Sequence, residues 1–424
     1  MAGGQDTYAV IGGEGFLGHA LILALYEKYP RAKLLSLDVV QRHYPQKGEW
    51  EFRSCDLTDE ASLSSALGQG VSGVFHTASP HIGGTKELCE KVNVEGTRNI
   101  VDVCRKLGIT KLVYTSSAGI PFDCTDLINV DERCTPAPKP IDPYNDTKAR
   151  AEAIILESNG KDGLLTCAIR PSGIFGPGDR QNIPGFLKVY KSGKTKFTIG
   201  GGLNMFDWTY VGNVVYAHLL ALEKLGTSVP TSVFEDRLPP VTGSLPRRFI
   251  PTSLSAPLSK SYNEDADALK AGGQIDPPLP ATRNRFDQFW NIEESEDGQV
   301  QVAGQAFYIT NGEPVPFWAW ARALWYEYAG HDKKMINLPT EVGLMYARVL
   351  SAICWLPGKE STLPVASVYY STAKRYYNIE KARRVLGYEP QTTLVEGMKE
   401  AVAWYKAHEA ELDAQNAAAA KTKA

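Results

Sequence analysis

The chain has 424 residues, of which 43% are hydrophobic and 22% charged, and its formal net charge is −3. This composition is typical of a soluble globular protein with a large core, and the charge, with no basic cluster, does not favour nucleic acid as a partner. The 7 cysteines and 7 histidines lack the spacing of a zinc site, so we expect no metal. The first residues lack the apolar run of a signal peptide, so we expect reduced thiols facing the cytosol.

The first motif is a glycine-rich turn between an apolar strand and an apolar helix. Gly12 permits the tight turn, Gly15 lets the backbone approach a pyrophosphate, and Gly18 lets the helix pack closely on the strand. Phe16 and Leu17 begin the helix, whose first N–H groups would face the phosphates. An ordinary strand–loop–helix corner is the alternative, but the flanking pattern favours dinucleotide binding.

An acid at the end of the next expected strand supports the same interpretation. Asp38 follows an apolar run at 33–37, about 20 residues beyond the turn, where a carboxylate can bind the adenosine ribose. Such a carboxylate would also repel a 2′-phosphate. The next three residues supply no cation, although Arg42 is close. We therefore expect NAD as cofactor, with NADP as the alternative.

Strand and helix signals alternate through the first 170 residues. Strands are expected at 8–11, 33–37, 50–55, 73–78, 111–115 and 164–169, and helices include 19–26, a long amphipathic one at 85–107, and one after Thr58 as its N-cap. Strands separated by helix-length segments indicate a doubly wound parallel sheet of the α/β class, which binds ligands at the carboxyl ends of its strands. We assign residues 1–180 to a dinucleotide-binding Rossmann domain, with His76 in its core rather than as a ligand.

The second half has a different pattern. Residues 181–225 are mixed, and we expect them to border the substrate cleft and return to the sheet. Residues 226–304 are rich in Pro, Ser and Gly and predict a mobile insertion that is mostly loop. Residues 305–408 predict a late strand at 305–310 and helices at 317–328 and 341–356, which together form a smaller C-terminal substrate-binding domain. The Ala/Lys-rich tail at 409–424 is expected to be disordered.

A tyrosine and a lysine stand four residues apart after Pro143. Tyr144 and Lys148 would share one face of a helix that Pro143 opens. A nearby ammonium and a cationic nicotinamide would favour the phenolate of Tyr144, which could then act as a base toward an alcohol. A hydroxyl at the end of the fifth strand would bind the substrate oxygen, and we favour Ser117, with Ser116 next. A solvent-facing Tyr/Lys pair is the alternative.

This combination resembles the extended short-chain dehydrogenase/reductases, and within them the 3β-hydroxysteroid dehydrogenase family. The resemblance covers nearly the whole chain except 226–304, and the similar segments are 10–18, 93–97, 113–117, 169–179 and 209–214. Residues 304–314 with Phe317-Trp318, and residues 381–390, are similar to the fungal sterol-4α-carboxylate 3-dehydrogenases (decarboxylating). Ile11 departs from the Thr of many members, and Trp208 from the usual Phe.

The resemblance implies further cofactor contacts. Asp56 and Leu57 would flank the adenine. The cofactor would be lined after the fourth strand by Thr77, Ala78 and Ser79, and the segment from Pro171 to Ile174 would run beside the nicotinamide. Asn93 would bind water or backbone near the site, although a buried asparagine at a helix bend is an equal alternative.

The implied reaction is NAD-dependent oxidation of the 3β-hydroxyl of a 4α-carboxysterol to the 3-ketone, with loss of the carboxylate as CO2. Alternatives are another 3β-hydroxysteroid dehydrogenase, a ketone reductase, a nucleotide-sugar epimerase, against which the 304–318 match argues, and a non-catalytic dinucleotide-sensing regulator. Candidate partners besides the sterol are other sterol C4-demethylation enzymes and a second copy of the chain. We expect peripheral attachment to the cytosolic face of the endoplasmic reticulum through residues 342–356, for which a buried core helix is the alternative.

Overall fold

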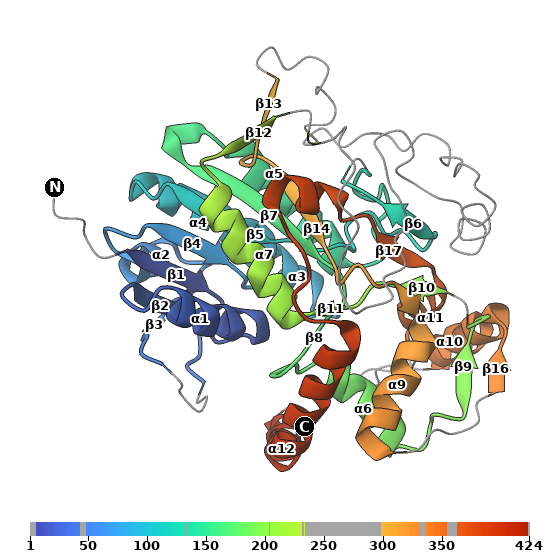
Figure 1. The fold of residues 1–424 in the computed structure, drawn as a ribbon. Helices are drawn as coiled ribbons and strands as arrows, with labels where there is room; N and C mark the ends of the chain where they lie inside the picture. Colours follow the sequence, from blue (N-terminus) through green and yellow to red (C-terminus); the bar gives the residue numbers. More distant parts are fainter. Residues whose placement is uncertain are drawn as a thin grey trace.

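A seven-stranded sheet lies at the centre of the computed structural model, which describes residues 6–42, 48–132, 134–202, 204–230, 233, 298–330, 336–353 and 363–422 (Figure 1). All neighbouring strands run parallel. The order across the sheet is β14 (Ala306–Ile309), β7 (Leu165–Pro171), β5 (Lys111–Thr115), β4 (Gly73–His76), β1 (Thr7–Ile11), β2 (Lys33–Asp38) and β3 (Glu51–Ser54). Each strand overlaps a segment predicted from the sequence, so the predicted doubly wound α/β fold is confirmed.

Helices cover both faces of this sheet. The first two below pack on one face and the other three on the opposite face: α1 (Phe16–Lys28), α7 (Val211–Lys224), α2 (Glu60–Leu67), α4 (Gly96–Lys106) and α5 (Pro143–Glu157) (Figure 1). In β1, Val10 belongs to the core under α1 and α7, whereas Ala9 and Ile11 belong to the other core. Because both faces are buried, the strands other than the edge strand β3 are largely apolar runs, which the sequence displays directly.

The long helix predicted at 85–107 forms, with a π-helical turn in its middle. It consists of α3 (Lys86–Cys89), the π-helical turn Glu90–Glu95, and α4. Thr85 caps its start by accepting a hydrogen bond from the N–H of Leu88 (3.2 Å). The cap of α2 is Asp59, which accepts from the N–H of Ala61 (3.0 Å). The prediction of Thr58 as that cap is wrong, because its hydroxyl donates instead to Asp56 (2.7 Å).

A second sheet of four strands lies beyond the carboxyl ends of the first (Figure 1). Its order is β15 (Val315–Pro316), β10 (Met205–Phe206), β17 (Arg375–Tyr377) and β6 (Leu127–Val130). The strands have only 2 to 4 residues and come from distant parts of the chain. They are too short for a periodic pattern, so the sequence did not reveal them.

The described parts of the predicted insertion at 226–304 include ordered strands. β12 (Ser228–Pro230) pairs antiparallel with β13 (Gln299–Gln301), and Val302 and Ala303 are buried in the core. The prediction of loop is therefore wrong at both ends, because pairing between segments about 70 residues apart leaves no mark on local composition. Residues 231–232 and 234–297 of this insertion lie outside the described residues.

The remaining elements flank the second sheet. They are the strand pairs β8 (Ile174–Phe175) with β11 (Thr209–Tyr210) and β9 (Phe197–Ile199) with β16 (Ile336–Leu338), and the helices α6 (Asn182–Lys191), α9 (Phe317–Ala329), α10 (Thr340–Ile353), α11 (Val365–Thr372) and α12 (Leu394–Thr422). Helices α9 and α10 match the predicted helices. The predicted disordered tail is wrong as far as Thr422, because Ala, Glu, Gln and Lys are strong helix formers and earlier turns of α12 anchor it through Ala401, Val402 and Tyr405.

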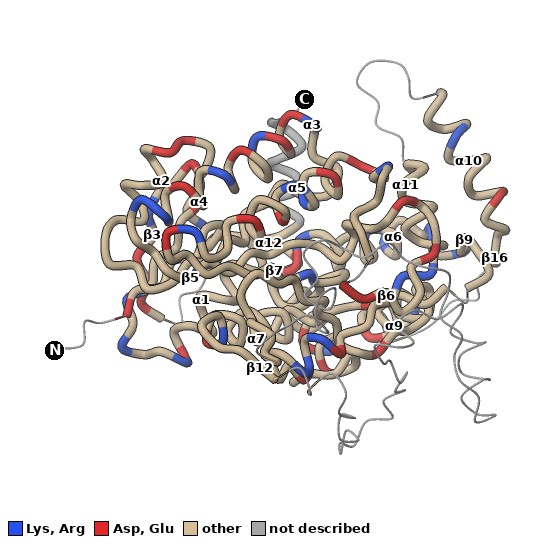
Figure 2. The backbone as a smooth tube through the Cα atoms, turned by 90° about the horizontal axis from the view of Figure 1, so that it is seen from above, with Lys and Arg blue, Asp and Glu red and all other residues tan. Residues whose placement is uncertain are grey.

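Helix α10 lies at the edge of the molecule, where Figure 2 shows it carrying few charges. Gly343 and Ala347 are buried, whereas Met345 is 63% and Val349 50% exposed. The alternative of a buried core helix is therefore wrong. Residues 354–356, the end of the predicted membrane segment, lie outside the described residues. Among the helices that the structure describes, none is long and apolar enough to span a bilayer.

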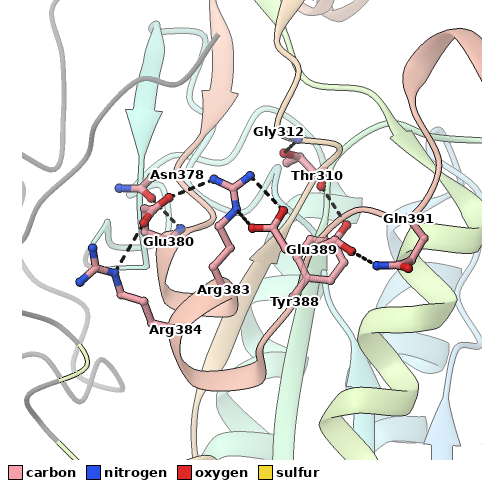
Figure 3. Close-up of polar contacts among 9 residues, drawn as sticks. All are labelled: Thr310, Gly312, Asn378, Glu380, Arg383, Arg384, Tyr388, Glu389 and Gln391. Atoms are coloured by element: carbon pink, nitrogen blue, oxygen red, sulfur yellow. Dashed lines mark hydrogen bonds and ion pairs between the residues drawn. The ribbon is translucent and has the colours of Figure 1, made fainter. Parts of the chain in front are cut away.

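The segment after β17 is fixed by a network of ion pairs (Figure 3). Arg383 pairs with Glu380 (3.0 Å) and Glu389 (2.9 Å), and the hydroxyl of Tyr388 donates to the carbonyl of Thr310 just after β14 (2.9 Å). These contacts hold the end of the second sheet to the end of the first. Residues 381–390, which resemble the sterol-4α-carboxylate 3-dehydrogenases, therefore help to hold the two sheets together.

Candidate active site

The glycine-rich turn has the close backbone packing of a dinucleotide-binding turn. Gly12 has φ +85°, and a Cβ there would lie 2.6 Å from the backbone nitrogen of Ala78. A Cβ on Gly18 would lie 2.1 Å from the carbonyl oxygen of Gly12, so neither position tolerates a side chain. Gly15 precedes α1 without a side-chain cap. The first N–H groups of α1, which begins at Phe16, therefore have no partner within the helix and suit a phosphate.

Asp38 lies at this turn, as predicted. One of its carboxylate oxygens accepts from the N–H of Glu14 (3.2 Å) and the other from the N–H of Val39 (2.8 Å). Burial raises the pKa of Asp38, and the backbone hydrogen bonds oppose this shift. The sequence analysis missed Glu14, whose buried carboxylate accepts from the hydroxyl of Ser36 (2.5 Å) and the N–H of Arg42 (2.8 Å). A lone acid within a glycine turn gives no signal of this role.

Among the other predicted cofactor contacts, some residues lie against the glycine-rich turn and others are buried in the core. After β4, the N–H groups of Thr77 and Ala78 donate to the carbonyl of Ile11 (2.9 and 3.0 Å), which places this segment against the glycine turn. Leu17 and Leu57 are both buried, with 8% exposure, so Leu17 can reach a ligand mainly through its backbone.

Asp56 stands beside Leu57 at the end of the strand that follows β2. It is exposed, and its carboxylate accepts from the N–H of Thr58 (2.9 Å). This bond and that of the Thr58 hydroxyl lower the pKa of Asp56. The carboxylate is therefore an exposed anion that follows the end of β3.

Tyr144 and Lys148 share one face of α5, as predicted. Asp142 caps this helix by accepting from the N–H of Asn145 (2.8 Å), and Pro143 occupies its first turn. The hydroxyls of Ser79 and Ser117 lie beside the Tyr144 hydroxyl and act to lower its pKa. Burial, with the nearby Asp142 carboxylate second, raises the pKa of Tyr144 to about 12, so the hydroxyl of the free protein is protonated at neutral pH.

Lys148 is 2% exposed, and its ammonium donates to the carbonyl of Thr115 at the end of β5 (2.5 Å). The ammonium also lies over the ring of Tyr114, 4.4 Å from its centroid. Burial lowers the pKa of Lys148 to about 7, while Glu152 one turn further along α5 opposes this shift. Glu152 is in turn held by the buried guanidinium of Arg170 (2.8 and 2.5 Å), a pair that the sequence analysis missed.

The structure distinguishes the two serines after β5. Ser117 accepts from the N–H of Gly119 (3.0 Å), and its hydroxyl lies beside that of Tyr144, whose pKa it acts to lower. Ser116 is 2% exposed, and its hydroxyl has no partner in the described part of the chain. Of the two hydroxyls, only that of Ser117 is therefore placed together with Tyr144.

Asn93 connects the elements around Tyr144. Its amide oxygen accepts from the hydroxyl of Ser79 (3.0 Å), and its amide nitrogen donates to Thr147 (3.0 Å). It lies in the π-helical turn Glu90–Glu95, and such turns often occur at functional sites. Both of these contacts are with side chains, so Asn93 holds Ser79 toward α5.

Pro171 and Ile174 lie beside Ser117 and the second sheet. The carbonyl of Pro171 accepts from the N–H of Ala118 (3.1 Å), one residue after Ser117. Ile174 pairs with Thr209 between β8 and β11. His76 is fully buried against Thr97 (3.0 Å), which confirms it as a core residue. Together these contacts gather the predicted catalytic group at the carboxyl ends of β4, β5 and β7.

Solved structures with a similar fold include two nucleotide-sugar enzymes in complex with NAD. One is a dTDP-glucose 4,6-dehydratase from Bacillus anthracis in complex with NAD, with a TM-score of 0.59, 17% identity, and coverage of 95% of this chain and 97% of that chain. Another is a UDP-glucuronic acid 4-epimerase from Bacillus cereus in complex with NAD, with a TM-score of 0.58, 15% identity, and coverage of 94% and 98%. At these identities the likeness establishes the fold alone.

Curated relatives resemble the chain over nearly its whole length. It is 34% identical to the sterol-4-alpha-carboxylate 3-dehydrogenase (decarboxylating) of Saccharomyces cerevisiae, over 94% of this chain and 97% of the relative. It is 30% identical to the protein of the same name in Mus musculus, over 93% and 89%. The model of the 3-beta hydroxysteroid dehydrogenase/isomerase family matches residues 9–263. The chain therefore belongs to the 3-beta hydroxysteroid dehydrogenase/isomerase family.

Proposed function

We propose that this protein oxidises the 3β-hydroxyl of a 4α-carboxysterol with a nicotinamide dinucleotide and releases the C4 carboxyl carbon as CO2. The observation that carries this proposal is the 34% identity, over 94% of the chain, to a yeast enzyme named for this reaction. The grouping of Tyr144, Ser117 and Lys148 beside the glycine-rich turn supports it, because alcohol oxidation needs a base and a hydride acceptor at one place.

In this mechanism Tyr144 removes the proton of the C3 hydroxyl while Ser117 donates a hydrogen bond to the same oxygen. A nicotinamide dinucleotide held by the glycine-rich turn and Asp38 would supply the hydride acceptor for C3 and a positive charge that favours the phenolate of Tyr144. Lys148, held between Thr115 and Tyr114, binds the cofactor ribose and adds to that charge.

The product of this oxidation is a β-keto acid. The bond between C4 and the carboxyl carbon then breaks, and its electron pair moves into the new carbonyl to give an enolate and CO2. Tyr144, now protonated, and Ser117 donate hydrogen bonds to the enolate oxygen until C4 is protonated. These residues therefore serve both steps without a further group.

The acids around the glycine-rich turn support NAD as the preferred cofactor. The Asp38 carboxylate stands beside the backbone of Glu14, whose own buried carboxylate lies within the same turn. Arg42 contacts Glu14 through its backbone N–H, and its side chain is exposed. A 2′-phosphate placed here would meet two acids, whereas ribose hydroxyls can donate to Asp38.

We propose further that the enzyme works at the cytosolic surface of the endoplasmic reticulum. Val342, Met345, Tyr346 and Val349 lie on one face of α10 and are 42–63% exposed. Ile336, 59% exposed, lies on the strand immediately before α10. We call these five residues the α10 patch. A helix of 14 residues is shorter than the roughly 20 needed to span a bilayer, so it would lie in the interface, where a nearly insoluble sterol is found.

The proposed reaction is tested directly with purified protein, NAD and a 4α-carboxysterol. The expected products are NADH and a 3-ketosterol that lacks the carboxyl carbon, identified by mass spectrometry and by release of labelled CO2. Oxidation without loss of that carbon would leave a plain 3β-hydroxysteroid dehydrogenase. Binding of NAD without turnover would contradict the proposal in favour of a sensing protein.

A further inference from the structure

Arg375 is a buried cation at the edge of the active site that the proposed mechanism does not use. It begins β17 and is 6% exposed. Its guanidinium carbon lies 4.6 Å from the ring centroid of Phe122, 4.6 Å from that of Tyr370 and 4.7 Å from that of Phe206. Aromatic faces attract a cation, but they do not neutralise its charge.

Arg375 differs from the other buried arginine of the described chain in having no acidic partner. Arg170 forms two hydrogen bonds with the carboxylate of Glu152. Within the described residues Arg375 forms no ion pair, and its guanidinium makes one hydrogen bond there, from Nη2 to the carbonyl of Tyr370 (3.0 Å). Its Nε is buried without a partner in the described structure. An unpaired buried cation is costly, and this arrangement is suited to an anion that arrives with a ligand.

The nearest acid is already engaged. Asp142, which caps α5, accepts from the hydroxyl of Tyr370 (2.7 Å) and from the backbone and side chain of Asn145 (2.8 and 3.1 Å). Asn145 also donates to the Tyr370 hydroxyl (2.7 Å). The carboxylate of Asp142 therefore tethers the Tyr370 ring to the start of α5. The guanidinium of Arg375 contacts this ring rather than the carboxylate.

Two of the rings around Arg375, those of Tyr370 and Phe122, belong to residues that are hydrogen-bonded to the segments that carry the catalytic group. Asn145, bonded to Tyr370, is the neighbour of Tyr144 in α5. The N–H of Phe122 donates to the carbonyl of Gly119 (3.0 Å), whose own N–H donates to Ser117.

The third ring, Phe206, packs against the segment between Pro171 and Ile174. A Cβ on Gly173 would lie 2.9 Å from the Phe206 ring. Arg375 thus stands where the second sheet meets the ends of β5, β7 and α5.

We propose that Arg375 binds the C4 carboxylate of the sterol substrate. This inference rests on the proposed function. The carboxylate is attached to the carbon next to C3, so it must lie beside the oxygen on which Tyr144 and Ser117 act. A planar guanidinium offers two parallel N–H groups to a carboxylate. Held among three rings, Arg375 would present its unpaired Nε–H to the carboxylate without large reorganisation.

This role affects substrate binding more than the chemical step. A guanidinium stabilises the carboxylate before the reaction, whereas in decarboxylation that charge moves away from it into the enolate. The interaction is therefore not stronger in the transition state and should appear mainly in KM. Arg375 is in this sense a specificity-determining residue that selects a sterol acid over an uncharged sterol.

The test compares two substrates that differ only in the substituent at C4, a 4α-carboxysterol and the matching 4α-methylsterol, both with a free 3β-hydroxyl. NADH formation is measured for the wild type, Arg375→Gln and Arg375→Lys. We expect the ratio of kcat/KM, acid over methyl, to fall by about 10- to 100-fold in Arg375→Gln, mainly through KM. Arg375→Lys, which keeps the charge but not the fork, should show a smaller fall. Arg384→Gln, whose side chain pairs with Glu380 away from these rings, is the matched control and should keep the wild-type ratio.

Each outcome separates this inference from the proposed function. A wild type that does not oxidise the acid contradicts the proposed function. A wild type that does so, with the ratio unchanged in Arg375→Gln, contradicts this inference alone. Equal losses on both substrates would mean that Arg375 only supports the second sheet, and would also contradict it. If Arg375→Gln does not fold, as judged by NAD binding and melting temperature, Arg375→Lys decides by the same ratio.

Discussion

The hydroxyl of Tyr144 and the ammonium of Lys148 are both shifted toward their neutral forms. Burial raises the pKa of Tyr144 to about 12 and lowers that of Lys148 to about 7. The sequence suggested that Lys148 would assist the phenolate, yet its ammonium contacts Thr115 and Tyr114. In this low-dielectric site an added positive charge lowers the pKa of Tyr144 more than it would in water. This favours a base that ionises only when a cationic cofactor is bound.

Tyr144→Phe should lower kcat by roughly 10²-fold or more, the usual scale for a positioned acid or base, while NAD affinity stays close to that of the wild type. Because a raised pKa keeps Tyr144 protonated, wild-type kcat/KM for oxidation should rise with pH toward the apparent pKa of this group, and the variant should lose that rise. Steady-state kinetics across pH measure both. Tyr326→Phe, on the exposed part of α9, is the control. Normal turnover in Tyr144→Phe would overturn the mechanism.

Asp38→Ala should narrow the preference for NAD over NADP by about tenfold, because it removes both a hydrogen-bond acceptor for the ribose and a repelling charge. The measurement is kcat/KM with each cofactor at saturating sterol. Asp102→Ala, a half-exposed acid on α4, should leave the preference unchanged. A wild type that prefers NADP would show that Arg42 outweighs Asp38.

The residues of the candidate site differ in whether a local sequence pattern reveals them. Tyr144, Lys148 and the glycine-rich turn are spacings within one segment, so the sequence displays them. Arg375 could not be found in this way, since its environment comes from Phe122, Phe206 and Tyr370, which stand far apart in the chain. A single arginine before two tyrosines gives no signal until the fold shows that the described residues offer it no counter-ion.

The same distinction holds for whole elements. Six strands of the central sheet were predictable because they are largely apolar runs buried on both faces, whereas the edge strand β3 is polar and partly exposed. The second sheet was not, because β10 and β15 have 2 residues each and are defined only by their partners. The helical tail of α12 was misjudged because an Ala/Lys-rich composition is shared by disordered and helical segments.

Helix α10 allows a prediction at the scale of one element. Met345→Glu combined with Val349→Glu places two charges on the α10 patch and should reduce co-flotation with phosphatidylcholine/phosphatidylserine liposomes several-fold. Both side chains are at least 50% exposed, so the melting temperature should change by only about 2 °C. Val395→Glu, 63% exposed on α12, is the matched control and should float like the wild type. Wild-type protein that never floats would contradict the membrane proposal.

At the scale of the whole molecule, one hydrophobic core joins the two sheets. It runs from Val10 in β1 through Val214 in α7 and Trp320 in α9 to Tyr405 in α12. The stacked rings of Trp208 and Trp320, 3.9 Å apart, lie within it, and the ion pairs of Figure 3 fasten its edge. A core shared in this way gives no reason for the dinucleotide-binding part to unfold separately from the C-terminal part.

We therefore expect a single thermal transition that moves as a whole when NAD binds. At an NAD concentration of about 100 Kd the stabilisation is about 2.7 kcal/mol, which for a protein of this size corresponds to a rise in Tm of the order of 5 °C. Differential scanning calorimetry with and without NAD measures it. Asp38→Ala should show a smaller rise at the same NAD concentration, because it weakens binding without touching the core. Two transitions of which only one moves with NAD would mean that the second sheet and α12 fold independently, and that the packing around Trp208 and Trp320 does not couple substrate side to cofactor side.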